Sequence, residues 1–194
     1  MGRKPGIAIS EDTDKVIALS NLFACARNEK TLSRDAQKFE AWIISQIDQN
    51  DKEFKKYRIT ARQSQSLLKI DKNYAHRKLI SISKELLGHV IQIKEGNQFK
   101  QYSLISSSTY HRGEGWCEIS IHPDLKPYLL ELREQGRFKL LELEIALSFS
   151  NFYSYPIYKL LKSYIHKNQN QFILEISIIE LKKIIGCYKK YNNY

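Results

Sequence analysis

Basic and polar side chains at helical spacing in the middle of the chain indicate phosphate binding. The set comprises Lys72, Asn73, His76, Arg77 and Lys84, and Arg62, Lys69, Lys94 and Lys100 lie nearby in the sequence. Ammonium and guanidinium groups bind phosphate oxygens, and an asparagine amide pairs with a base edge. The alternative is a solvated charged surface, because many lysines serve only solubility.

The overall charge favours phosphate binding. Lysines and arginines number 31 against 21 aspartates and glutamates, so the 194 residues carry a formal net charge of +10 at pH 7. Such a surplus is expected of a protein whose partner is nucleic acid.

Residue types that catalysis and metal binding use are scattered. The five histidines form no His-x-His pair and the three cysteines form no Cys-x-x-Cys pair; they are His76, His89, His111, His122, His166, Cys25, Cys117 and Cys187. Tyr153, Tyr155 and Tyr158 could act as nucleophiles, but their near-helical spacing favours packing. We expect neither an enzyme nor a cofactor or metal, although a triad assembled in space stays open.

The chain carries no sign of export. An odd number of widely spaced cysteines fits a reducing compartment, and the basic Gly2-Arg3-Lys4-Pro5 start precedes no apolar signal region. No apolar run approaches the length of a membrane span. We expect a cytoplasmic location and no membrane partner.

Residues 60–104 have the pattern that would position the basic side chains. Thr60 and Gln63 form a capping box at the start of a first helix, and Asp71 caps a second. One face of that second helix is apolar, with Ala75, Leu79, Ile82 and Leu86, so the basic residues point away from the core. Gly88 ends it.

A β-hairpin is predicted after the second helix. Apolar residues alternate with polar ones on both sides of Glu95-Gly96-Asn97, which predicts a tight turn between two strands. Helix, turn, helix and hairpin together predict a winged helix-turn-helix within an α+β fold, with this hairpin as the wing.

The flanking segments supply further elements. Residues 1–14 are expected to form a flexible basic arm, in which Arg3 and Lys4 could touch phosphate. From there to the helix-turn-helix we expect an extended run over 16–19, a helix over 21–27, a helix capped by Ser33 and a strand at Tyr57 and Ile59. After the hairpin we expect a loop over 106–115, a strand over 117–121, a helix after Pro123, and helices over 141–148 and 151–167.

The C-terminal part of the chain repeats the pattern of the middle part at an offset of 117 residues. Leu174 and Ile176 fall on the strand residues Tyr57 and Ile59, and Ser177 with Glu180 falls on the first capping box. Gly186 would end the repeated helix, so the repeat's recognition helix would start near Tyr188. We therefore expect a first winged-helix domain over 15–149 and, over 150–194, a second winged-helix unit that is truncated before its recognition helix.

Three segments carry a family resemblance. They are Ser20-Asn21-Leu22, the HPDLKPYLLEL run at His122 to Leu132, and FSNFYSYPIYKLLKSY at Phe149 to Tyr164. The chain resembles the iteron-binding plasmid replication initiators, or Rep proteins, whose signature is Tyr-Ser-x-Arg-(Ile/Leu)-Tyr-Glu-Leu-Leu. Pro156 stands where the family usually has Arg, and Lys159 stands where it usually has Glu.

The resemblance implies tandem winged-helix domains that bind repeated origin sites in double-stranded DNA. It also implies that the first domain grips phosphates and mediates homodimer formation, that the second reads bases, and that host replication proteins are further partners. An initiator that represses its own gene as a dimer is the leading hypothesis. The alternatives are a winged-helix transcriptional regulator unrelated to replication and a protein interaction module, since winged helices serve all three purposes.

Overall fold

The computed structural model describes residues 15–111, 113–132, 138–165 and 172–191. The predicted arm over 1–14 therefore lies outside the described residues. The helices are α2 (Asn21–Ala24), α3 (Arg34–Ser45), α4 (Ala61–Leu68), α5 (Lys72–Leu87), α6 (Lys126–Leu129), α8 (Leu143–Ser148), α9 (Ser154–Tyr164) and α10 (Ile178–Ile184), with 3-10 turns η1 (Pro123–Leu125) and η2 (Tyr188–Tyr191). The strands are β1 (Val16–Ser20), β2 (Arg27–Asn28), β3 (Lys56–Thr60), β4 (Val90–Glu95), β5 (Gln98–Ser103), β6 (Ile105–His111), β7 (Trp116–Ile121) and β8 (Phe138–Glu142).

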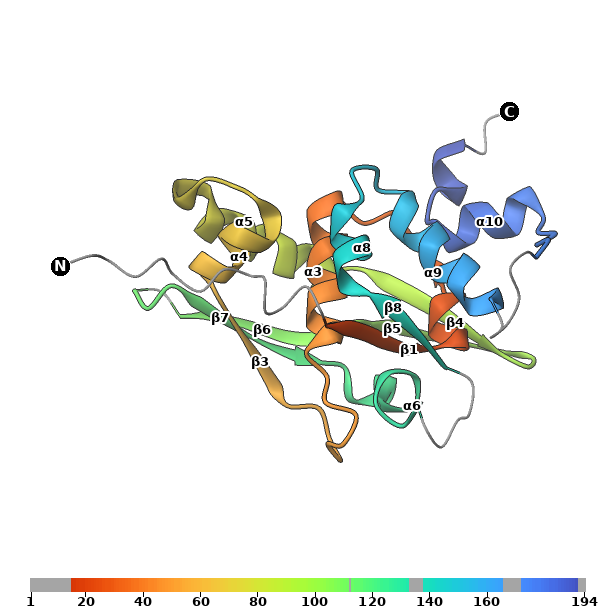
Figure 1. Cartoon of the computed structure of the whole chain (residues 1–194), viewed down its shortest axis with the longest axis horizontal. Helices are drawn as coiled ribbons and strands as arrows, with labels where there is room; N and C mark the ends of the chain where they lie inside the picture. Colours follow the sequence, from red (N-terminus) through yellow and green to blue (C-terminus); the bar gives the residue numbers. More distant parts are fainter. Residues whose placement is uncertain (1–14, 112, 133–137, 166–171, 192–194) are drawn as a thin grey trace.

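These strands form three small antiparallel sheets around α3. The sheet orders are β1-β8, β2-β4-β5 and β3-β7-β6. Helix α3 is the centre of the core, because Phe39, Ile43 and Ile44 on it are almost fully buried. Figure 1 shows α3 near the middle of the molecule, with α4 and α5 on one side and α9 and α10 on the other.

The predicted winged helix-turn-helix is confirmed, but its wing is a different hairpin. The β4–β5 hairpin forms at Gly96-Asn97 as predicted, yet β4 pairs with β2. The strand that enters the helix-turn-helix, β3, pairs with β7, and β7 pairs with β6. Since a wing shares the sheet of that entering strand, the wing is the β6–β7 hairpin. The predicted loop over 106–115 is wrong for the same reason, because most of it is strand β6.

Other elements differ from the predictions in detail. Helix α2 is shorter than the predicted 21–27, and strand β8 lies just ahead of the helix predicted over 141–148. Pro156 lies in the first turn of α9, where a missing N–H costs nothing, so it does not kink the helix. Gly88 ends α5 with a φ of −91°, an ordinary backbone conformation rather than a left-handed one.

The C-terminal segment shows only part of the predicted repeat. Ser177 caps α10 through a bond from the Glu180 N–H, and Gly186 follows the helix with a φ of +76°. Leu174 and Ile176, however, lie in a segment that forms neither strand nor helix, so the strand predicted there is wrong. A strand needs a neighbour to supply its hydrogen bonds, and a pattern of alternating residues does not supply one.

Polar contacts attach this segment to the first part of the fold. Lys159 on α9 forms a 2.7 Å ion pair with Glu40 on α3, and both side chains are only 9% exposed. Arg27 on β2 binds both carboxylate oxygens of Glu180 at 2.8 and 2.7 Å. The Thr31 hydroxyl donates to the Ile185 carbonyl at 2.8 Å. The segment therefore packs on the first part of the chain, although Leu161 stays 39% exposed.

Candidate nucleic-acid interface

Three local features set the orientation of α5. The Thr60 hydroxyl accepts a hydrogen bond from the Gln63 N–H, and the Gln63 side chain accepts one from the Thr60 N–H, so the predicted capping box is confirmed. Lys69 adopts the left-handed conformation, with a φ of +54°, and makes the tight turn out of α4. Asp71 then caps α5 by accepting a 2.8 Å bond from the Asn73 N–H.

Burial divides α5 into an inner and an outer face. Ala75, Leu79, Ile82 and Leu86 are each at most 1% exposed, as the apolar spacing predicts. The predicted contact residues Arg62, Lys69, Asn73, Arg77 and Lys84 are all exposed. The backbone of Lys72 starts α5, but its side chain lies outside the described part of the structure. Helices α4 and α5 thus present basic side chains to solvent.

His76 is placed differently from its neighbours. It is half-buried, its ring meets the Tyr110 ring of β6 edge-on with centroids 4.5 Å apart, and its Nδ1 atom hydrogen-bonds the Tyr110 hydroxyl. This contact fixes α5 against β6. His76 therefore contributes by positioning the helix on the wing sheet rather than by an open side chain.

The β3-β7-β6 sheet, which includes the wing, carries a cluster that lies outside the predicted contact residues. The Arg58 guanidinium of β3 lies over the Trp116 ring at 4.2 Å from its centroid, and the His111 ring of β6 stacks on Trp116 with centroids 3.5 Å apart. These residues lie on three neighbouring strands of one sheet. The available signal was the alternation of Arg58 with buried Tyr57 and Ile59, which places Arg58 on the outer face of its strand.

Lys94 and Lys100 lie on the other hairpin. Figure 1 shows the β4–β5 turn at the opposite end of the molecule from α4 and the β6–β7 hairpin. Lys100 forms an ion pair with Glu95. The hydrogen bond from Lys100, and to a smaller extent the one from Tyr128, lowers the pKa of the Glu95 carboxyl. The Lys94 ammonium lies 6.0 Å from the centre of the Phe99 ring. The structure therefore does not bring these two lysines together with the α5 residues.

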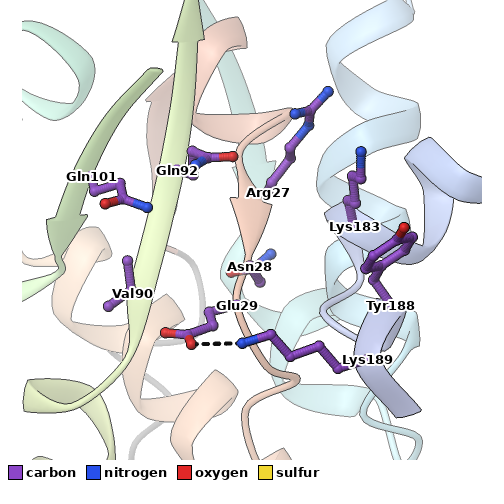
Figure 2. A pocket seen from close by; sticks show the side chains of 9 residues that line it. All are labelled: Arg27, Asn28, Glu29, Val90, Gln92, Gln101, Lys183, Tyr188 and Lys189. Atoms are coloured by element: carbon purple, nitrogen blue, oxygen red, sulfur yellow. Dashed lines mark hydrogen bonds and ion pairs between the residues drawn. The ribbon is translucent and has the colours of Figure 1, made fainter. Parts of the chain in front are cut away.

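A hollow of about 400 Å³ lies between the β2-β4 edge and the C-terminal helices. Figure 2 shows Arg27, Gln92 and Gln101 on the sheet side and Lys183, Tyr188 and Lys189 on the helix side. Its cations already have partners, because Lys189 pairs with Glu29 at 3.0 Å, Arg27 pairs with Glu180, and Lys183 lies over the Tyr188 ring. Those contacts make the hollow part of the packing between the two segments.

Among the residues that the structure describes, no group of three or more His, Cys, Asp or Glu side chains is arranged to hold a metal ion. No helix within the described ranges is long and apolar enough to cross a membrane.

The sheet order, the capped helix pair and the exposed basic face of α5 together define a winged-helix protein. Residues 16–162 match the family model described as initiator replication protein, WH1. Since the match covers most of the chain, the protein belongs to this family of replication initiators, which confirms the resemblance found in the sequence.

A solved structure of an initiator has a similar fold. A crystal structure of Pi initiator protein in complex with iteron DNA aligns with a TM-score of 0.68 and 21% identity, covering 89% of this chain and 73% of that one. The WH1 domain of MSBI1.176, a replication protein isolated from a multiple sclerosis patient, aligns over 61% of this chain and 87% of that one, with a TM-score of 0.41 and 17% identity. A search of curated protein sequences gives no match.

Proposed function

We propose that this replication initiator binds repeated duplex sites at a plasmid origin through α4, α5 and the β6–β7 wing. The single observation that carries the proposal is the outer face of α5, where Asn73, Arg77 and Lys84 are exposed beside Arg62 and Lys69. The family match supports initiation, and the Pi initiator, whose fold is similar, is described in complex with iteron DNA.

Binding rather than catalysis is the proposed mode of action. Duplex DNA carries regularly spaced phosphates, and each cation that meets one releases a bound counterion. Four exposed cations lie on or beside the helix pair, namely Arg62, Lys69, Arg77 and Lys84. Strand β3, which pairs with the wing strand β7, adds Arg58, and the chain's net charge of +10 raises the rate of encounter.

We also propose the division of the chain into a winged-helix domain over 15–149 and the beginning of a second one over 150–194. The cap at Ser177 and the stop at Gly186 support it, because they match a first helix of a helix-turn-helix. Homodimer formation, repression of its own gene and contacts with host replication proteins stay predictions from the family.

Salt titration tests the proposal. The DNA is a duplex of directly repeated sites from beside the coding gene. The affinity of the protein for this duplex is measured by fluorescence anisotropy as the salt concentration rises about fourfold, from about 50 to about 200 mM. Four phosphate contacts give a slope of roughly −3.6 in log affinity against log salt, and so a loss of roughly a hundredfold over that range. The Arg77→Glu variant should bind more weakly, while Lys30→Glu, the same charge change at an exposed residue on another surface, should change little.

Two results would overturn the proposal. One is an affinity that does not change with salt. The other is equal weakening by the Arg77→Glu and Lys30→Glu variants, which would mean that only net charge matters. A regulator unrelated to replication would instead prefer a site that is not repeated near an origin.

A further inference from the structure

Tyr74 is an exposed aromatic residue at the start of α5. Its side chain is 62% exposed, although the next residue, Ala75, is 1% exposed. The Tyr74 N–H donates to the Asp71 carbonyl at 3.0 Å, so the position belongs to the capped first turn. The Arg77 guanidinium lies over the ring, 5.6 Å from its centroid. The ring is thus held by a fixed helix end and by a cation one turn away.

The Tyr74 hydroxyl can donate to a phosphate oxygen, but that contact leaves the exposed ring without an apolar partner. Packing the ring against an apolar group would add free energy that a phosphate contact does not supply. In the major groove the apolar group on a base edge is the 5-methyl of thymine. The first residues of a recognition helix are the ones that reach base edges, and Tyr74 is the third residue of α5.

We propose that the Tyr74 ring packs against a thymine methyl group in the major groove, with Arg77 stacked behind it. The inference rests on the proposed function and deepens it, because it assigns base reading to a residue of the first winged helix. The family resemblance implies that this domain positions the protein on phosphates, so the assignment adds sequence preference to a surface expected to lack it. Arg77 covers one face of the ring and is itself exposed, so it can meet a neighbouring phosphate while the other face of the ring meets the methyl group.

The test uses duplexes in which uracil replaces thymine, since the two bases differ only by the methyl group. Duplexes that the wild-type protein enriches from a random-sequence pool are resynthesised with uracil at one thymine at a time. Loss of one buried methyl should weaken binding roughly fourfold at the contacted position. Tyr74→Ala should bind thymine and uracil duplexes equally, whereas Tyr74→Phe should keep the wild-type preference.

A matched control and the opposing outcomes complete the design. Tyr164→Ala removes an exposed tyrosine from α9, which lies on the other side of α3 from α5. This variant should keep the wild-type preference for thymine. The inference is overturned if every uracil duplex binds as well as its thymine parent, if Tyr74→Phe loses as much affinity as Tyr74→Ala, or if the pool yields no preferred sequence. In each of those cases duplex binding itself still stands, while absence of all duplex binding by the wild type would refute the proposed function.

Discussion

Replacing Lys159 by methionine should destabilise the fold by about 3–5 kcal/mol, because the change leaves the buried Glu40 carboxylate without its partner. The two side chains are each 9% exposed and lie 2.7 Å apart. The Lys159 ammonium also lies 4.7 Å from the centre of the Tyr155 ring and 5.6 Å from that of Phe23, so few waters can replace it. Methionine retains the unbranched stem and removes only the charge and its contacts.

The double variant Glu40→Met with Lys159→Met is the matched control. Replacement of a whole buried ion pair by apolar side chains of similar size is often neutral or stabilising, so this variant should recover most of the loss. The free energy of unfolding is measured by urea titration, followed by circular dichroism and by fluorescence of the buried Trp42 on α3. A cost below about 1 kcal/mol for Lys159→Met, the range of exposed pairs, would refute the view that α9 buries this pair against α3.

Two further changes test the packing of the C-terminal segment and the state of a buried histidine. Gly186→Ala should lower the free energy of unfolding by about 2 kcal/mol or more, because its φ is +76° and an added Cβ would lie 2.5 Å from the Lys30 carbonyl carbon. The control Gly96→Ala, with a φ of +56° and open space around the added Cβ, should lower it by about 1 kcal/mol. Equal losses for the two variants in urea titration would contradict this prediction. Burial lowers the pKa of His89 to about 4, below the 6.5 of an unfolded chain, so unfolding takes up a proton between these values and stability falls as pH drops through this window. Unfolding free energies at about pH 7.5 and pH 5 should differ by about 2 kcal/mol more for the wild type than for His89→Gln, and equal pH dependence of the two proteins would contradict a neutral buried His89.

Local signals in the sequence predicted the helix-turn-helix correctly. Caps at Thr60 and Asp71 and the apolar stripe from Ala75 to Leu86 depend on residues within one or two helical turns. The exposure of Arg62, Asn73 and Arg77 follows from the same periodicity. These features were predictable because the chain decides them over short distances.

Strand pairing was the part that the sequence left open. The β4–β5 hairpin was visible from its turn, but its pairing with β2 depends on a two-residue strand some 60 positions earlier, with Arg27 opposite Gln92. Strand β6 contains a run of serines, and only Ile105 in it is buried, so it lacks the apolar alternation that would predict a strand. Consequently Lys94 and Lys100 were grouped with α5, and Arg58 and Trp116 were not.

The Lys159–Glu40 pair shows a similar limit. Lys159 departs from the family signature, and its charge has a partner 119 residues earlier that no short pattern reveals. His76 was selected for its place on the helix, but its contact with Tyr110 joins two elements that only the fold brings together. Residues that act between distant elements were therefore the ones whose roles could not be predicted.

The most direct test of the DNA interface compares two double variants with the same change in charge. Arg77→Ala with Lys84→Ala removes two cations from α5, and Lys94→Ala with Lys100→Ala removes two from the β4–β5 hairpin. The salt dependence of duplex binding is measured for both proteins and for the wild type. The α5 variant should lose about two units of the salt slope and bind more weakly, while the hairpin variant should keep the wild-type slope. A reduced slope for the hairpin variant, with an unchanged one for the α5 variant, would contradict the placement of the interface on α4 and α5.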